Sequence, residues 1–199
     1  MSIPPCRLAG YAPFNVQNLN GVLYVTYAKQ GASLMDEVTG AGLGIVNRFD
    51  LNGNLLGRLA TGGSLNAPWG LAIAPSSFGT MAGALLVGNF GDGRITAYDL
   101  SSNALIGQLL DTSNQPVSID GLWGLALGND GSGGSSQRLY FTAGPDDEAH
   151  GLFGVLSAVP EPGTLALLLA ALAALASVRA LGRRSHQALA QNCTPSRPW

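Results

Sequence analysis

The chain has 199 residues, of which 46% are hydrophobic and only 11% are charged, and its formal net charge is −2. The apolar content is enough to bury a core, but the charge content is far below the roughly 25% of an average soluble domain. All 12 acidic residues precede residue 163 and basic clusters are missing there, which argues against nucleic acid as a partner.

The N-terminal segment 1–10 contains neither the basic nor the apolar region of a secretory signal peptide. We interpret it as a disordered or truncated N-terminus. Cys6 lies here and Cys193 lies near the other end of the chain, so these two residues indicate neither a disulfide framework nor a metal-ligand cluster.

A repeat begins at residue 11. Phe14, Trp69 and Trp123 each open a similar apolar segment, and they follow one another at intervals of about 54 residues. Each segment is predicted to be a first strand. The second strands are predicted at 23–27, 85–90 and 139–142, the third at 45–51, 94–100 and 152–156, and the fourth at 55–59 and 105–110.

Tight turns separate these strands. Asn20-Gly21, Asn52-Gly53 and Asp92-Gly93 are dipeptides that tolerate the positive φ of hairpin turns. Asp50 and Asp99 stand at matching positions of the first two units, where we expect their carboxylates to accept hydrogen bonds within their own turns.

Four antiparallel strands in about fifty residues are typical of a β-propeller blade. We therefore predict an all-β fold with a partial β-propeller of about three blades over 11–157. The third unit lacks a fourth strand, and three blades are fewer than a closed propeller needs. The chain is expected to be half of a longer propeller or of a dimer, and its unpaired strand edges predict self-association.

The segment 158–184 is predicted to contain one C-terminal transmembrane helix. Residues 163–178 carry no charge and would span about 24 Å as a helix. Arg179, Arg183 and Arg184 follow as membrane-flanking basic residues. A buried Ala/Leu-rich core helix is the alternative interpretation. The polar segment 185–199 is interpreted as a disordered tail.

The order of Val159, Pro160, Glu161 and Pro162, an apolar helix and a basic end resembles the PEP-CTERM sorting signal of Gram-negative bacteria. This resemblance implies recognition and cleavage at the Pro-Glu-Pro stretch by an exosortase. It also implies an exported protein that is anchored in the inner membrane before processing and is then found at the cell surface or outside the cell.

The repeat region is also similar to a known family. The segments NAPWGLAIAP, LLVGNFGDGRI and LYFTAGPDDEAHGLFG resemble a family of exported bacterial proteins of uncharacterised function with NHL-like propeller repeats. The resemblance implies a fold and a location, but no reaction.

The densest polar cluster is Asp146, Asp147, Glu148 and His150, which follow Gly144-Pro145. Carboxylates suit calcium and an imidazole suits a transition metal, so these residues are a candidate metal site. A solvated acidic turn is the favoured interpretation. Asp92 is interpreted as a turn residue rather than a ligand, and the two repeat tryptophans as core aromatics rather than a stacking surface for a flat ligand.

We find no nucleophile motif, phosphate loop or zinc spacing in the sequence, and we expect no cofactor. The sequence therefore favours a non-enzymatic, exported, membrane-sorted binding protein or matrix-associated protein. The alternatives are a secreted propeller-type hydrolase or lyase that uses a carboxylate-bound cation, and a truncated gene fragment. The expected partners are an exosortase, the inner membrane and further copies of the chain.

Overall fold

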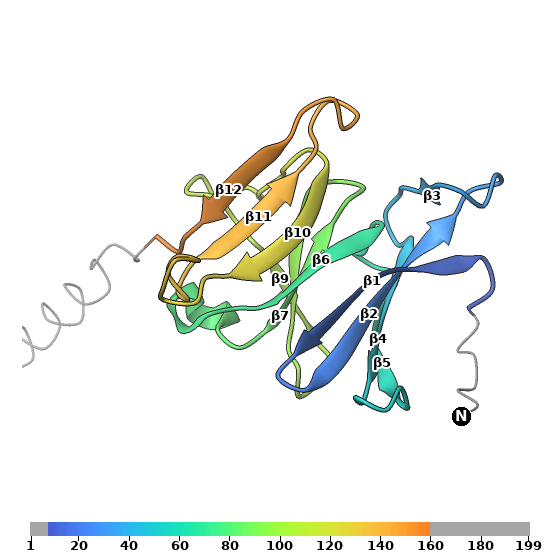
Figure 1. Cartoon of the computed structure of the whole chain (residues 1–199), viewed down its shortest axis with the longest axis horizontal. Coiled ribbons are helices and arrows are strands. Elements are labelled where there is room, and N and C mark those ends of the chain that lie inside the picture. Colours follow the sequence, from blue (N-terminus) through green and yellow to red (C-terminus); the bar gives the residue numbers. More distant parts are fainter. Residues whose placement is uncertain (1–7, 160–199) are drawn as a thin grey trace, which may run out of the picture. The chain divides into compact units, whose positions relative to one another are not determined.

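The computed structural model describes residues 8–159. The chain divides into two units, Met1–Ala158 and Val159–Trp199, and the description that follows concerns the first. Its described part is all-β. Figure 1 shows three antiparallel sheets that follow one another along the chain, with one short 3-10 helix, η1 (Ser76–Met81), between strands of the second sheet.

The first sheet has the strand order β1-β2-β4-β5, and β3 pairs with β2. The second sheet has the order β6-β7-β8-β9, and the third has the order β10-β11-β12. The bounds of the strands are β1 (Tyr11–Leu19), β2 (Val22–Gln30), β3 (Glu37–Val38), β4 (Gly44–Phe49), β5 (Leu55–Thr61), β6 (Pro68–Ile73), β7 (Leu85–Asn89), β8 (Ile95–Tyr98), β9 (Leu105–Gln108), β10 (Leu122–Leu127), β11 (Leu139–Ala143) and β12 (Leu152–Leu156).

Local turn chemistry explains where the strands end. Asn20 (φ 53°) and Gly21 (φ 82°) join β1 to β2 as a two-residue hairpin, because both residues accept the left-handed conformation. Gly93 (φ 67°) supplies the left-handed conformation in the longer turn between β7 and β8, where its N–H donates to the Asn89 carbonyl at 2.9 Å. The strand positions predicted from the repeat are confirmed, each within a few residues.

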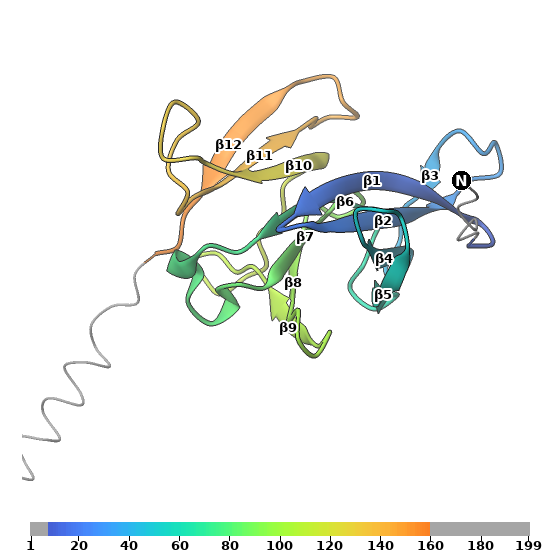
Figure 2. The same cartoon turned by 60° about the horizontal axis from the view of Figure 1, so that its bottom comes forward.

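The second sheet is covered on both faces. Side chains of β7 alternate, so Leu85 and Val87 pack against the first sheet while Leu86 packs against the third. The inner strand β6 contacts both β1 and β10 and lies between them in Figures 1 and 2. The core is therefore two apolar layers, one on each side of the second sheet.

The fold class predicted from the sequence needs correction. A partial propeller followed by one transmembrane helix is expected there, whereas the observed fold is an all-β structure of three antiparallel sheets. Within residues 8–159, no helix is long and apolar enough to cross a membrane. The apolar run 163–178, on which the transmembrane helix is expected, lies outside the described residues.

Candidate functional site: the open edge and face of the third sheet

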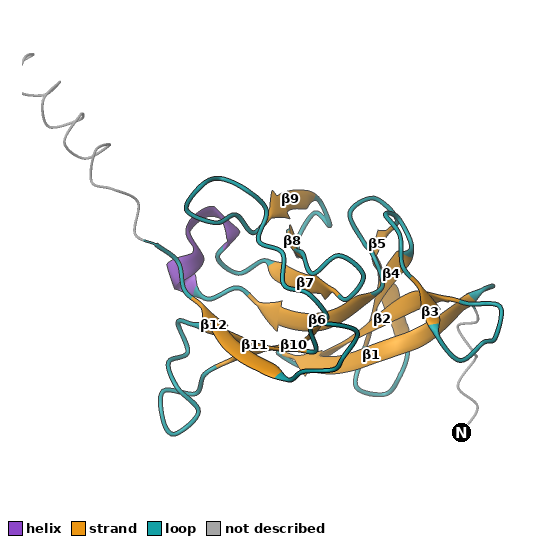
Figure 3. Cartoon of the chain, turned by 90° about the horizontal axis from the view of Figure 1, so that it is seen from above, coloured by secondary structure: helices purple, strands orange, loops and turns teal. Residues whose placement is uncertain are grey.

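The third strands of the three sheets differ in burial. In the first two sheets these strands, β4 and β8, are almost wholly buried, because a fourth strand pairs with each of them. In the third sheet β12 has the equally apolar sequence LFGVL, yet no strand of the described residues pairs with its outer side. Leu152, Phe153 and Val155 are 46%, 70% and 45% exposed. An apolar strand is thus left as a sheet edge (Figure 3).

The outer face of the third sheet, on the side away from the second sheet, is also apolar. Leu139 and Phe141 of β11 point into the core, so Tyr140 between them points outward. Its ring stacks on Phe153 with a centroid distance of 5.9 Å and an interplanar angle of 9°. Val155 pairs with Tyr140 across the two strands. The half-buried Tyr140 ring and the exposed side chains of Phe153 and Val155 form an apolar patch, which we call the outer patch.

The fourth strands that are present share a short pattern. Leu55-Leu56-Gly57-Arg58-Leu59 and Leu105-Ile106-Gly107-Gln108-Leu109 both place two apolar residues before a glycine, then a polar residue and a leucine. Gly57 has φ +150° and Gly107 has φ +157°, and each stands next to a register shift in the pairing with the third strand. Glycine is needed there because other residues rarely adopt these angles.

The turns before the fourth strands are held by aspartates, as the sequence predicts. Asp99 accepts hydrogen bonds from the hydroxyl and the backbone N–H of both Ser101 and Ser102, at 2.6 to 3.0 Å. In the first sheet, Asp50 accepts hydrogen bonds from the side chain and the backbone of Asn54. These donors, the Ser101 and Asn54 side chains foremost, hold the pKa of both carboxyls below their ordinary value.

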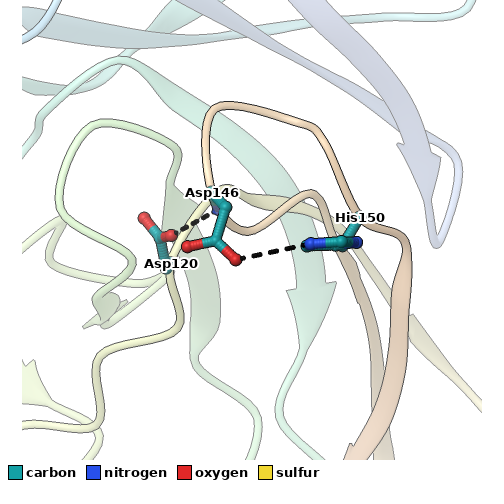
Figure 4. A network of polar contacts seen from close by, with 3 residues as sticks. All are labelled: Asp120, Asp146 and His150. Atoms are coloured by element: carbon teal, nitrogen blue, oxygen red, sulfur yellow. Dashed lines mark hydrogen bonds and ion pairs between the residues drawn. The ribbon is translucent and has the colours of Figure 1, made fainter.

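The acidic cluster lies in the exposed loop between β11 and β12. Figure 4 shows Asp146 between two partners: its carboxylate lies 3.8 Å from Nε2 of His150, and its backbone N–H donates to Oδ2 of Asp120 at 3.0 Å. Glu148 turns to another partner and accepts a hydrogen bond from Nε1 of Trp123 at 3.3 Å. The cluster is therefore divided among separate contacts.

This division bears on the candidate metal site. No group of three or more histidine, cysteine, aspartate or glutamate side chains within residues 8–159 could hold a metal ion. Asp146, Asp147 and Glu148 all adopt positive φ, so they form a left-handed turn stabilised by the hydrogen bond from Glu148 N–H to the Gly144 carbonyl at 3.1 Å. The arrangement fits the solvated-turn interpretation better than a metal centre.

The sorting-signal residues are almost all beyond the described part of the chain. Val159 is the last described residue and is 67% exposed. The other residues predicted for this signal lie outside the described residues: Pro160, Glu161, Pro162, Arg179, Arg183 and Arg184.

The repeat aromatics connect neighbouring sheets. The rings of Phe14 and Trp69 meet edge to face, with centroids 4.5 Å apart. Nδ2 of Asn15 donates to the Trp69 carbonyl at 2.8 Å. Trp123 packs over Gly144, where an added Cβ would lie 2.4 Å from its ring. These contacts agree with the interpretation of these residues as packing aromatics.

The sequence analysis does not predict a buried polar link between the end of β7 and the connection from β5 to β6. Asn89 lies at the end of β7, is fully buried, and accepts a hydrogen bond from the Asn66 backbone N–H at 3.1 Å while it donates to the Ser64 carbonyl at 2.8 Å. An isolated asparagine at a strand end resembles a turn residue, so no local pattern identifies such a link. The stacking of Tyr140 on Phe153 was missed because it depends on strand register.

No family model matches the chain. Three relatives are uncharacterised proteins of Acanthamoeba polyphaga mimivirus. The first is 39% identical over 145 residues, which is 72% of this chain and 35% of the relative. The second is 35% identical over 147 residues, 73% of this chain and 38% of the relative. The third is 36% identical over 116 residues, 58% of this chain and 22% of the relative.

These comparisons correct three expectations. The relatives come from a giant virus of amoebae, so the resemblance to a bacterial NHL-like family with a PEP-CTERM signal is wrong. The exosortase assignment depends on that resemblance and loses its support. The expected location in a Gram-negative bacterium is overturned by the same relatives. The chain spans about a third of the length of the first two curated relatives that it matches.

Proposed function

We propose that this protein is a non-catalytic binding module that takes up an extended polypeptide segment as the fourth strand of its third sheet. The observation that supports this proposal is the exposure of β12, whose counterparts β4 and β8 are buried under a fourth strand. An open strand edge binds an extended peptide through backbone hydrogen bonds, and the neighbouring side chains select its sequence.

The energetics favour an apolar partner. Leu152 and Val155 are about half exposed, and burying a side chain of this kind completely is worth about 1.5–3 kcal/mol. The fourth strands already present show what such a partner contains: two apolar residues, a glycine, one polar residue and a leucine. The expected partner is therefore a polypeptide with this pattern in extended conformation.

A cation-dependent hydrolase or lyase at the loop 144–151 is the competing function. The carboxylates of this loop are held in separate contacts with His150, Trp123 and the turn backbone. No geometric observation therefore favours a cation-dependent enzyme. We therefore propose the binding function alone.

The test uses a fluorescein-labelled peptide with the sequence of residues 54–61, titrated with the full-length protein and followed by fluorescence anisotropy. Saturable binding is expected. A peptide with proline in place of Gly57 should bind weakly, because proline cannot donate in the new strand pair. If neither this peptide nor one with the sequence of residues 103–110 binds, the proposal is wrong.

Protein variants locate the binding site. Leu152→Lys places a charge on the open edge and should weaken peptide binding about tenfold or more, since tenfold corresponds to roughly 1.4 kcal/mol. Leu105→Lys is the matched control: Leu105 is 53% exposed on β9, an edge strand of a four-stranded sheet. Equal effects of both substitutions would place the peptide elsewhere and would contradict the proposal. Circular dichroism of both variants verifies that they fold.

A further inference from the structure

The inner strands of the three sheets repeat one contact. Asn15 of β1 reaches the Trp69 carbonyl of β6 through its side chain, at 2.8 Å. Gly70 stands at the same repeat position and approaches the Trp123 carbonyl of β10 so closely that an added Cβ would lie 2.7 Å from it. At each step, the residue after one repeat aromatic meets the carbonyl of the next repeat aromatic.

In the third sheet, no described residue of another sheet contacts the residue at this repeat position. Gly124 follows Trp123, and a Cβ built there would meet, among the described residues, only Oγ1 of Thr142 in its own sheet, at 3.1 Å. Gly124 does not have positive φ, so its position does not require glycine for a turn. The contact that joins the first sheet to the second, and the second to the third, is therefore not made a third time.

The first and third sheets each carry exposed apolar side chains on the face that points away from the second sheet. On the third sheet, two of the three residues of the outer patch, Phe153 and Val155, are exposed. On the first sheet Val16 is 60% exposed; it pairs with Val25 and follows Asn15, whose side chain points to the second sheet. Val16 therefore points to the opposite side.

We propose that copies of this chain associate head to tail, with the outer face of the third sheet of one copy against the outer face of the first sheet of the next. This contact extends the interfaces already present between the sheets, because the Phe14 carbonyl of the incoming β1 takes the place beside Gly124 that the Trp69 and Trp123 carbonyls take beside Asn15 and Gly70. It rests on the sheet faces, whereas the proposed peptide site lies on the β12 edge.

Two single variants of the full-length chain test the proposal, followed by analytical ultracentrifugation. Phe153→Glu places a charge on the third-sheet face and leaves the first-sheet face intact, whereas Val16→Glu does the opposite. A head-to-tail contact uses two different surfaces, so each variant alone should be monomeric while an equimolar mixture forms heterodimers. The native chain should form concentration-dependent oligomers.

Other outcomes would overturn the proposal. If Val16→Glu alone still dimerises, the third-sheet faces pair with each other. If both variants alone keep the association of the native chain, it arises elsewhere in the chain, for example from the apolar run 163–178. If the native chain is monomeric, no such contact exists. Leu105→Glu, which alters an exposed position on the outermost strand of the second sheet, is the control and should leave the association unchanged. Peptide binding at β12 is measured separately, so the two proposals fail independently.

Discussion

The second and third sheets are built from the same repeat but differ in how far their apolar side chains are covered. Every residue of β7 and β8 is buried, because the second sheet lies between two others and has four strands. In the third sheet β11 alternates between buried and more exposed residues, and most of β12 is exposed. The sequences LLVGN and LFGVL are similarly apolar. Burial of a strand here depends on its neighbours, not on its own composition.

The largest expected effect on the free energy of unfolding is that of a core truncation, which tests how strongly burial differs between the second and third sheets. Leu86 of β7 is fully buried between the second and third sheets, so Leu86→Ala should lower the free energy of unfolding by about 2–5 kcal/mol. Phe153→Ala removes a larger side chain that is 70% exposed and should cost only about 1 kcal/mol, mostly the ring contact with Tyr140. Urea denaturation measures both. Equal losses would show that the third sheet is covered in solution.

A smaller loss of stability is expected when the buried hydrogen bonds of the Asn89 side chain are removed. Asn89→Ala leaves the Asn66 N–H and the Ser64 carbonyl without their buried partner, which should cost about 1–3 kcal/mol. At the equivalent position of the third sheet, Ala143 is buried without a polar side chain. Asn18→Ala is the control, because Asn18 caps an exposed turn through a hydrogen bond from Gly21 N–H at 3.0 Å. A loss no greater than that of the control would refute the structural role of Asn89.

The smallest effect is the pH dependence of the turns before the fourth strands. The pKa of Asp50 and of Asp99 is lowered in the folded chain from the ordinary 3.8 by hydrogen bonds to each carboxylate. The unfolded chain therefore binds more protons as the pH falls below about 5, so stability should decrease there and remain constant at neutral pH. Asp99→Asn should flatten this decrease, as followed by thermal unfolding between pH 7 and pH 3. An unchanged pH profile would contradict the role of this carboxylate.

Much of the local structure could be predicted from the sequence. The position of the strands followed from the repeat led by Phe14, Trp69 and Trp123, and the aspartate turns followed from their matching positions. The unpaired third strand of the last unit was also predicted, because no fourth-strand pattern follows residue 156 before the proline-rich stretch. The outer patch could not be predicted, since it depends on strand register and on which face meets the core.

The sequence by itself determined which segments are strands and where they turn, because alternation, β-branched and aromatic residues, and Asn-Gly or Asp-Gly pairs act within a few residues. Only the tertiary structure decided which faces are covered. Leu86 and Phe153 are both apolar residues of similar strands, and the presence or absence of a neighbouring sheet makes the first a core residue and the second a surface one. Such coverage depends on contacts between distant segments, which no local pattern contains.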